Sequence, residues 1–528
     1  MTGTVDAVVV GSGPNGLVAA NLLADRGWDV VVVEQAAEPG GAVRSAEVTA
    51  PGFTNDLFSA FYPLGYASPV IDGLELGSHG LRWCRAPLAL AHPTPDGPTA
   101  VIGPTVDETC ASLEAFAPGT GEGWRRLYAR WTSVAEPLLG ALLSPLPPVR
   151  HGLELVRRLG PRGTAELARQ GLLPVRRLAE EHHVGEGGAL LLAGCALHAD
   201  LTPETAGGAL YGWLLASLAQ QVGFPVPEGG AGALTAALGR RLAAAGGEVR
   251  CGAAVVGIEL RDGRAAGVRL ADGSVLGARR AVLADVGAPA LYRDLVGLDR
   301  LPATVAADVG RFQYGVGTVK VDWALSGPVP WRSETARRAG TVHVADSLDQ
   351  LTEHATALAT HRLPPDPFLL VGQMTTADPT RSPAGTESAW AYTHVPQRLA
   401  PGPGVGPGGR LDREGSEAVA DRMAARLEAY APGFGRLVLA RHVAGPDDLE
   451  AANPNLVGGA TTGGTAQLHQ QLVLRPTPGG GRSETPVPGL YLASASAHPG
   501  GGVHGACGSN AARAAVWHDR IRRTRRWR

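Results

Sequence analysis

Short apolar runs alternate with a helical stretch at the start of the chain. Residues 8–10 and 30–33 are continuous runs of valine. Residues 14–26 between them carry apolar positions at helical spacing, and Gly27 follows as a helix-stop signal. Apolar runs of this length are typical of buried parallel strands. The pattern therefore predicts a strand, a helix and a second parallel strand.

A glycine pattern lies where the first strand passes into the helix. Gly11, Gly13 and Gly16 have the spacing G-x-G-x-x-G, and Pro14 and Asn15 fall in the first helical turn. The first glycine allows a tight turn, the second lets a pyrophosphate approach the backbone, and the third allows close packing of helix on strand. Free N–H groups at the helix start favour phosphate binding. The turn therefore predicts a dinucleotide site.

The second strand ends in an acidic residue. Glu34, followed by Gln35, lies at the distance from the glycines at which a carboxylate accepts the ribose hydroxyls of an adenosine. The alternative, a glycine-rich turn that binds no ligand, is the weaker interpretation because strand, turn, helix and acid occur together. NAD and FAD both remain open at this point.

The middle of the chain returns to the same kind of pattern. Residues 234–245 predict a helix, and residues 248–251, 255–260, 265–270 and 281–284 predict strands, with Asp262-Gly263 as a hairpin turn. We expect Val255 and Val256 to cover the adenine and Asp285 to lie beside the cofactor. Gly229 to Leu234 is not a second G-x-G-x-x-G, so no NAD(P)H site is expected.

A second strand, glycine loop and helix follow near the C-terminus. Residues 489–493 predict the strand, and a helix extends to about Trp517. The loop between them contains His498, Gly500, Gly501, Gly502, Val503 and His504. A helix N-terminus at such a turn can stabilise negative charge on a bound ring.

The remaining segments suggest a second structural unit. Residues 70–224 are mostly helical in pattern, and residues 301–478 are mostly strands, with a helix from Ser416, its expected cap, to Tyr430. The uncharged run 205–227 fits a buried helix better than a membrane span, because it contains several glycines and glutamines. Arginines between 150 and 177 fit a solvated face, although a membrane-surface helix stays open.

Composition narrows the function classes. The chain has 528 residues, a net charge of −2 and 44% hydrophobic residues. The length suits two intertwined domains. The small net charge predicts no general attraction to nucleic acid. Five scattered cysteines show no metal spacing, so we expect reduced thiols, no metal and a cytoplasmic protein without a signal peptide. The basic segment 520–528 is expected to be a solvated end.

The pattern resembles the phytoene desaturase-like FAD oxidoreductases, which include carotenoid desaturases and isomerases and the pyridine nucleotide-disulphide oxidoreductase domain-containing proteins. The resemblance covers almost the whole chain. Its motifs are residues 8–44, Gly229-Gly230, 320–325, 378–383, 453–459 and 490–512. It selects FAD as the cofactor through Gly40, Gly41 and Arg44, where the family carries a glycine pair and an arginine. It also suggests that the aromatic loop 51–63 lies beside the flavin, although a satellite hydrophobic cluster explains that loop equally well.

The resemblance implies an α/β fold of amine oxidase and phytoene desaturase-like architecture. A doubly wound, Rossmann-like FAD-binding domain would comprise residues 1–70, 225–300 and 480–528. An inserted α+β substrate domain would comprise a helical part, 71–224, and a sheet part, 301–479. The glycines 500–502 would then approach the isoalloxazine ring.

The function implied is an FAD-dependent dehydrogenase or desaturase. A hydride would pass from an apolar, polyene or lipid-like molecule to flavin N5, with O2 or a quinone as the electron acceptor and with peripheral membrane contact left open. His498, His504 and Lys320 are the candidate bases, although a salt bridge suits Lys320 better. A redox-neutral double-bond isomerase and a non-catalytic flavin-bound scaffold are the alternatives. An amine oxidase is a fourth, weakened by the 5% content of aromatic residues.

Overall fold

One sheet gathers strands from the beginning, the middle and the end of the chain. The computed structural model describes residues 3–526, and within them this sheet has seven strands in the order β10-β11-β12-β1-β2-β9, with β18 also paired to β12. The strands are β1 (Thr4–Val10), β2 (Val30–Val33), β9 (Glu248–Arg250), β10 (Val255–Arg261), β11 (Arg264–Leu270), β12 (Val275–Ala284) and β18 (Leu490–Leu492). Strands β1, β2, β9, β12 and β18 pair in parallel. The predicted Rossmann-like fold is confirmed.

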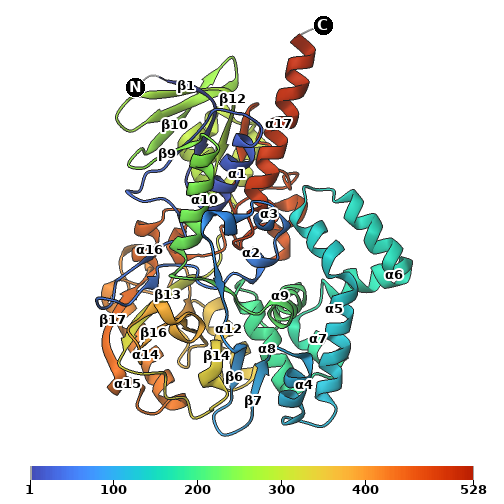
Figure 1. Cartoon of the computed structure of the whole chain (residues 1–528), viewed down its shortest axis with the longest axis vertical. Coiled ribbons are helices and arrows are strands. Elements are labelled where there is room, and N and C mark those ends of the chain that lie inside the picture. The colour runs from blue at the N-terminus through green and yellow to red at the C-terminus, as the bar shows by residue number, and fades with distance from the viewer. Residues whose placement is uncertain (1–2, 527–528) are drawn as a thin grey trace.

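The two faces of this sheet are covered differently. Helices α1 (Pro14–Ala24), α10 (Gly232–Ala244) and α17 (Ala506–Arg526) pack on one face, together with Val9 and Leu283. The side chains of Val8 and Val282 point to the other face, where they pack among residues of β10, β11 and the helical segment Ala290–Val296. Alternating side chains of single strands thus feed two hydrophobic cores. Figure 1 shows α17 as the red helix that passes the sheet and projects beyond it.

A second sheet occupies the opposite half of the molecule (Figure 1). Its seven strands within the described residues follow the order β17-β13-β16-β15-β14-β6-β7. They are β6 (Leu88–Pro93), β7 (Thr99–Ile102), β13 (Gly317–Leu325), β14 (Ala339–Val344), β15 (Leu369–Gln373), β16 (Glu387–Val395) and β17 (Val438–Ala444). Strands β13 to β17 lie within residues 301–478, where the sequence predicted mostly strands. The predicted predominance is wrong, because more of these residues are helical than extended. Two more strands, β6 and β7, come from the segment expected to be helical.

The helical expectation for residues 71–224 is therefore wrong for part of that segment. Strand β6 pairs antiparallel with β7, which follows it directly, and in parallel with β14, which lies far along the chain. The rest is helical: α4 (Val106–Glu114), α5 (Thr120–Leu143), α6 (Val149–Gln170), α7 (Val175–His182), α8 (Gly185–Leu197) and α9 (Gly208–Val222). Helix α9 is the predicted buried helix in the uncharged run, and Trp213 on it is almost fully buried.

The helix beside the second sheet begins earlier than expected. Helix α14 is Arg413–Tyr430, and the carboxylate of Asp412 accepts a hydrogen bond from the Gly415 N–H at 2.8 Å. Ser416 is therefore inside the first turn and is not the cap. Asp, like Ser, is a favoured N-cap, and only the backbone geometry shows which of the two the helix uses.

Short elements complete the connections. They are β3 (Ser45–Ala46), β4 (Asn55–Asp56), α2 (Pro63–Ala67), α3 (Pro69–Asp72), β5 (Trp83–Cys84), β8 (Val226–Pro227), α11 (Ala303–Gly310), α12 (Leu348–Ala359), α13 (Met374–Ala377), α15 (Phe434–Leu437) and α16 (Pro446–Ala452). The basic segment expected as a solvated end is helical as far as Arg526, and residues 527–528 lie outside the described residues. Among helices in the described part, none combines the length and apolar character needed to cross a bilayer.

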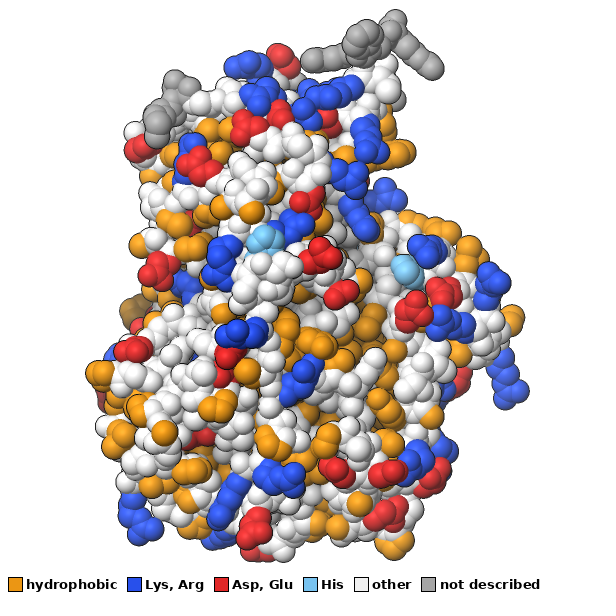
Figure 2. Space-filling view, viewed as in Figure 1, with side chains coloured by type: hydrophobic (Ala, Val, Ile, Leu, Met, Phe, Trp, Pro, Cys, Tyr) orange, Lys and Arg blue, Asp and Glu red, His pale blue; other side chains and the backbone are white. Residues whose placement is uncertain are grey.

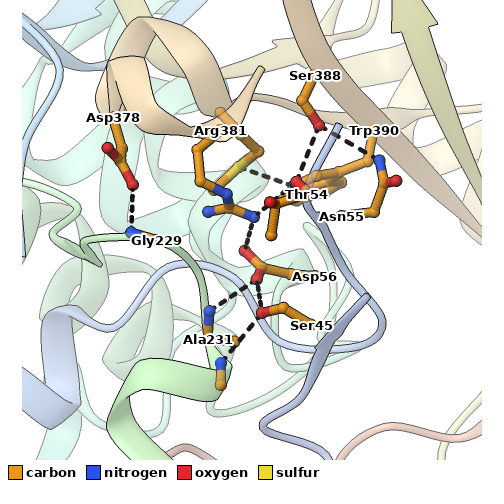
Figure 3. A network of polar contacts seen from close by, with 12 residues as sticks. Ser45, Thr54, Asn55, Asp56, Gly229, Ala231, Asp378, Arg381, Ser388 and Trp390 are labelled. Atoms are coloured by element: carbon orange, nitrogen blue, oxygen red, sulfur yellow. Dashed lines mark hydrogen bonds and ion pairs between the residues drawn. The ribbon is translucent and has the colours of Figure 1, made fainter. Parts of the chain in front are cut away.

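A buried ion pair ties the two halves together (Figure 3). The guanidinium of Arg381 lies 2.8 Å from the carboxylate of Asp56, and both side chains are fully buried. Asp56 also accepts hydrogen bonds from the hydroxyl of Ser45 at 2.7 Å and from the Ala231 N–H at 2.8 Å. Three segments that are distant in the sequence therefore share one carboxylate.

We predict that Arg381→Met destabilises the protein strongly. Removal of one partner leaves a buried carboxylate without its cation, which costs about 3–5 kcal/mol. Arg413→Met is the matched control, because Arg413 pairs with Glu417 on an exposed helix surface and such pairs contribute about 0.3–0.5 kcal/mol. Urea unfolding monitored by tryptophan fluorescence should give a lower midpoint for Arg381→Met than for Arg413→Met. Equal unfolding midpoints would contradict a stabilising role for the Asp56–Arg381 ion pair.

Candidate functional site

A cavity of about 560 Å³ lies between the two sheets. Residues from the N-terminal βαβ unit, the C-terminal glycine loop, α9 and the second sheet all line it. Of the residues predicted from sequence, the cavity wall includes Gly11, Gly13, Pro14, Asn15, Glu34, Gln35, Gly41, Arg44, Val255, Asp285, Lys320, Gly501, Gly502 and Val503. Gly16, Gly40, Val256, His498, Gly500 and His504 are not part of that wall. The two predicted glycine turns, almost a whole chain apart, therefore face one cavity.

The N-terminal turn packs as tightly as its glycines suggest. A Cβ on Gly16 would lie 2.2 Å from the carbonyl oxygen of Gly11, and a Cβ on Gly13 would lie 2.6 Å from Asp285 Oδ2. Gly11 has φ of +92°, a conformation in which other residues are strained. Gly16 thus serves helix packing, whereas Gly11 and Gly13 face the cavity. The bare backbone of Gly13 is the point where a pyrophosphate could approach.

Asp285 closes this turn from the neighbouring strand. Its Oδ2 accepts the Gly16 N–H at 2.8 Å, and its backbone N–H donates to Val10 O at 2.7 Å. Burial raises the pKa of Asp285 to about 7; the Gly16 N–H opposes this rise, and the nearby Glu34 carboxylate contributes to it. A carboxyl group beside a phosphate turn is therefore neutral below neutral pH and ionised above it.

Glu34 lies on the opposite side of the turn. Its Oε2 accepts hydrogen bonds from the Ser12 N–H at 2.8 Å and the Ser12 hydroxyl at 2.7 Å, and its Oε1 accepts the Ala36 N–H at 2.9 Å. The carboxylate therefore shapes the turn as well as facing the cavity. Oε1 retains a lone pair, which fits an acceptor for a ribose hydroxyl.

The glycine pair and the arginine that follow lie over the turn. Gly40 donates its N–H to Ser12 O at 3.1 Å, and a Cβ on Gly41 would lie 3.0 Å from Gly13 Cα. Arg44 donates to Gly41 O at 3.0 Å and to Ala452 O at 2.8 Å, and its guanidinium lies 5.3 Å from the centroid of the Phe58 ring. Gly40 holds the loop, and Gly41 and Arg44 face the cavity.

Val256 is placed differently from the prediction. It is 52% exposed, whereas its neighbour Val255 lines the cavity. Successive side chains of a strand point to opposite faces, so β10 can bring only one of the two valines to the cofactor.

The C-terminal turn brings backbone to the cavity but not its histidines. His498 Nε2 is 3.2 Å from Ser144 O, and His504 Nδ1 accepts the Ala506 N–H at 3.0 Å. Both rings are buried, and burial lowers the pKa of each to about 4. Both imidazoles thus hold the loop in place, and neither lies in the cavity wall where a base would have to be. Gly500 lies against Arg475.

Lys320 reaches the cavity as half of an ion pair. Its ammonium binds both carboxylate oxygens of Asp322, two residues along β13, and lies 5.9 Å from the centroid of the Trp390 ring. Both side chains are at most 5% exposed. Burial raises the pKa of Asp322, and the Lys320 ammonium opposes that shift. The salt bridge preferred from the sequence is present.

Arg475 is a buried cation that sequence reasoning missed. Its guanidinium donates to four backbone carbonyls, those of Thr462, Gly464, Thr465 and Ala495. No carboxylate pairs with it among the described residues. It joins two loops that line the cavity, and burial lowers its pKa. An isolated arginine in a Pro/Gly-rich segment carries no sequence signal for this role.

Two histidines form a second missed feature. His198, at the end of α8, lines the cavity, and its Nε2 lies 3.0 Å from Nε2 of His343 on β14. One ring must donate and the other accept. Burial lowers the pKa of His198 to about 3, so the pair is neutral. Their distance apart in the chain hides the contact from any local pattern.

Asn455 is a third missed residue, although its segment was part of the resemblance. Its side-chain amide joins Gly287 N–H, at 2.8 Å, to Asp285 O, at 3.3 Å. Asn453, Pro454 and Asn455 all line the cavity. The motif at residues 453–459 was the available signal.

Apolar and aromatic side chains dominate the part of the cavity away from the phosphate turn. They come from the aromatic loop, α2, α8, α9 and β16, and include Phe58, Phe61, Tyr62, Leu64, Leu214, Leu215, Phe224, Trp390 and Tyr392. The aromatic loop therefore forms cavity wall and is more than a satellite cluster. The arrangement can hold a dinucleotide at one end and an apolar molecule at the other.

Known proteins agree with this arrangement. Residues 9–72 match the NAD(P)-binding Rossmann-like domain. The chain is 29% identical to the rat pyridine nucleotide-disulfide oxidoreductase domain-containing protein 2, over 96% of this chain and 92% of that protein. It is 34% identical to prolycopene isomerase 2, chloroplastic, of an Oncidium hybrid cultivar, over 23% of this chain and 21% of that protein.

The fold is shared with a solved structure of putrescine oxidase bound to putrescine. The TM-score is 0.61 at 16% identity, and the match covers 98% of this chain and 99% of the other. The Rossmann-like, amine oxidase-like fold predicted from the sequence is therefore confirmed. So is the resemblance to oxidoreductases of this group.

We predict that FAD affinity falls as pH rises from 6 to 8, because Asp285 loses its proton beside the diphosphate. Ionisation near pH 7 places a negative charge next to Gly13, and a roughly tenfold loss, about 1.4 kcal/mol, is expected. Asp285→Asn should remove most of this dependence. Fluorescence titration of apoprotein with FAD measures the affinity of the wild type and of the variant at each pH. Glu34 is present in both proteins, so its contribution to binding is the same. Equal pH slopes would rule out the role assigned to Asp285.

Proposed function

We propose that this chain, with its Rossmann-like domain and its resemblance to oxidoreductases, is an FAD-dependent enzyme that removes hydride equivalents from an apolar small molecule. The observation that carries the proposal is the shared cavity. Two glycine turns and a group of apolar side chains face the same space, so a dinucleotide and an apolar substrate can meet there.

The residues present fit FAD. The bare backbone of Gly13 and the N-terminus of α1 suit the diphosphate, and Glu34 suits the adenosine ribose. Gly41 and Arg44 cover this region, while Gly501 and Gly502 expose backbone near the start of α17. When bound, the flavin supplies an acceptor for the hydride equivalent.

The chain's own residues then bind, orient and exclude water. The aromatic loop and α9 supply the apolar walls, which favour a substrate with little polar surface. Arg475, held by backbone carbonyls, places a fixed positive charge at the wall, whereas Asp322 neutralises the charge of Lys320. Fixed positive charge stabilises negative charge that develops during reduction.

His198 is suited to hydrogen bonding and poorly suited to proton abstraction. It is the histidine in the cavity wall, but its pKa of about 3 makes it a weak base at neutral pH. Its Nε2 is engaged with His343, which leaves Nδ1 for the substrate. We therefore infer an apolar substrate that carries a hydrogen-bonding group. We assign no base to His498 or His504, since neither lines the cavity.

An amine oxidase is the second candidate, because the fold is shared with putrescine oxidase. Trp390 and Tyr392 both line the cavity and are nearly parallel, at 12°. Their centroids are 6.0 Å apart, whereas a group held between two rings needs about 7 Å, twice a van der Waals contact. The pair therefore forms a wall and does not form a cage around an amine.

The remaining alternatives share the same residues. A double-bond isomerase would use the cavity without net electron transfer, and the similarity to a prolycopene isomerase favours it over part of the chain. A non-catalytic scaffold would bind FAD but turn nothing over. As electron acceptor we propose O2 or a quinone, and a cytoplasmic or membrane-peripheral location fits such a substrate.

Anaerobic mixing tests the reaction type. We expect that holoenzyme mixed with an active apolar alkene loses its oxidised-flavin absorbance in proportion to product. Conversion without bleaching identifies the isomerase, and bleaching by amines alone identifies the amine oxidase. A protein that binds FAD but turns over no compound would contradict an enzymatic role. The compounds to be tested, with O2 or a quinone present, are polyenes, terpenes, unsaturated lipids and amines.

We predict that Glu34→Ala weakens FAD binding about 10- to 100-fold. The loss removes hydrogen bonds to a charged acceptor, worth about 1.5–3 kcal/mol, and also frees Ser12 in the phosphate turn. Glu38→Ala is the matched control, because Glu38 is exposed a few residues further along the same segment. Retention of FAD through gel filtration and its dissociation constant are the measurements. Unchanged retention in the Glu34 variant would argue against this end of the site.

A further inference from the structure

Helix α6 exposes an apolar stripe on a projecting part of the molecule. Val149, Leu153 and Val156 follow at spacings of four and three residues and are 62%, 61% and 42% exposed. Figure 1 shows α6 at the outer edge of the helical part, and Figure 2 shows hydrophobic, basic and acidic side chains on that lobe. The opposite side of α6 is anchored by the buried Leu155 and Leu167. The exposed stripe is thus separate from the side that packs on the protein.

A loop beside the cavity exposes two more apolar side chains. Leu472 and Val473 are 50% and 56% exposed, while the preceding residue, Gln471, lines the cavity. Leu472 has φ of +55°, a left-handed conformation that costs a bulky residue of the order of 1–3 kcal/mol. The chain therefore holds apolar side chains outward, with a strained backbone, at the edge of the substrate space.

The stripe and the loop are neighbours. Arg482 donates from Nε to Leu146 O at 3.0 Å, in the link between α5 and α6. A Cβ on Gly481 would lie 2.9 Å from Val473 Cα and 3.1 Å from Leu146 Cδ1. We call Val149, Leu153, Val156, Leu472 and Val473 the apolar rim. It borders a cavity whose wall continues through Gln471 and Arg475.

Several arginines around the rim lack an acidic partner. Arg150, Arg157 and Arg162 on α6 make no ion pair among the residues that the structure describes, and neither does Arg482. The other arginines of this region are paired, Arg158 with Glu154 and Glu136, Arg169 with Glu166 and Glu181, and Arg176 and Arg177 with further acidic residues.

We propose that the apolar rim docks the protein on the surface of an anionic lipid bilayer. An apolar stripe flanked by arginines is the arrangement of helices that lie in the headgroup region, and unpaired arginines are attracted to anionic lipids. The contact is peripheral, since α6 is too charged to cross the bilayer. An apolar molecule dissolved in the membrane then reaches the cavity beside Gln471 without passing through water.

A second copy of the chain fits this surface less well. A two-fold interface would bring the same patch against itself, so the unpaired arginines of both copies would face each other without acidic partners. Bilayer headgroups supply the opposite charge. Dimerisation is nevertheless an outcome that the experiment separates.

Co-sedimentation with vesicles tests the proposal without reference to FAD or turnover. Full-length protein is mixed with vesicles of phosphatidylcholine alone or of phosphatidylcholine and phosphatidylglycerol in equal parts. We expect binding to the anionic vesicles that weakens with salt, and at least about tenfold weaker binding to the neutral ones. Absence of binding to anionic vesicles overturns the proposal.

Two sets of variants locate the contact. Leu472→Ser with Val473→Ser, and Leu153→Ser with Val156→Ser, should each weaken partitioning about tenfold. Leu439→Ser is the matched apolar control, because Leu439 is 59% exposed on β17. Arg150→Glu with Arg157→Glu should abolish the preference for anionic lipid, and Arg261→Glu with Arg300→Glu should not.

Three further results would refute the assignment. Equal losses in rim and control variants would show non-specific adsorption, and undiminished binding in both rim variants would place the contact elsewhere. Analytical ultracentrifugation that shows a wild-type dimer converted to a monomer by the rim substitutions would assign the rim to a second copy. Because partitioning is measured on apoprotein as well, failure here is distinct from failure of the proposed oxidoreductase function.

Discussion

The register of one central strand is the constraint on which the site depends. Ala284 of β12 pairs with Val10 of β1 on one side and with Leu492 of β18 on the other. Each of those strands is followed by a glycine turn. Because parallel strands end at the same edge of a sheet, this register brings both turns to one cavity. A shift of β12 would move Asp285 away from Gly13 and separate the two turns.

The buried charges differ in their partners: some pair with an opposite charge, and others bind only backbone groups. This difference suggests their roles. Asp56 and Arg381 neutralise each other and join segments, so they serve the architecture. Asp285 has a backbone N–H as its partner, and Arg475 has backbone carbonyls. Such groups keep electrostatic influence on whatever enters the cavity, because no opposite charge cancels them. The cavity wall therefore contains a titratable carboxyl, Asp285, and a fixed positive charge, Arg475.

One short loop, residues 471–473, contributes side chains both to the cavity and to the outer surface. Gln471 faces inward and accepts a hydrogen bond from the Tyr211 hydroxyl at 3.4 Å, whereas Leu472 and Val473 face outward. A soluble protein gains nothing from exposed apolar side chains on a strained backbone. The proposed membrane contact explains the exposure and the apolar character of the cavity by the same property of the substrate.

Local patterns in the sequence determined the βαβ unit, both glycine turns, Glu34, most strands of both sheets and the resemblance to FAD oxidoreductases. These features depend on periodicity and on glycines whose role is set by their immediate neighbours. Tertiary structure alone decided the rest. Strand β6 pairs with β14, about 250 residues away, and β7 joins the sheet through β6. His198 contacts His343, Arg475 binds four backbone carbonyls, and His498 and His504 do not line the cavity. Such contacts join residues far apart in the chain or depend on where a side chain points, and no local pattern encodes either.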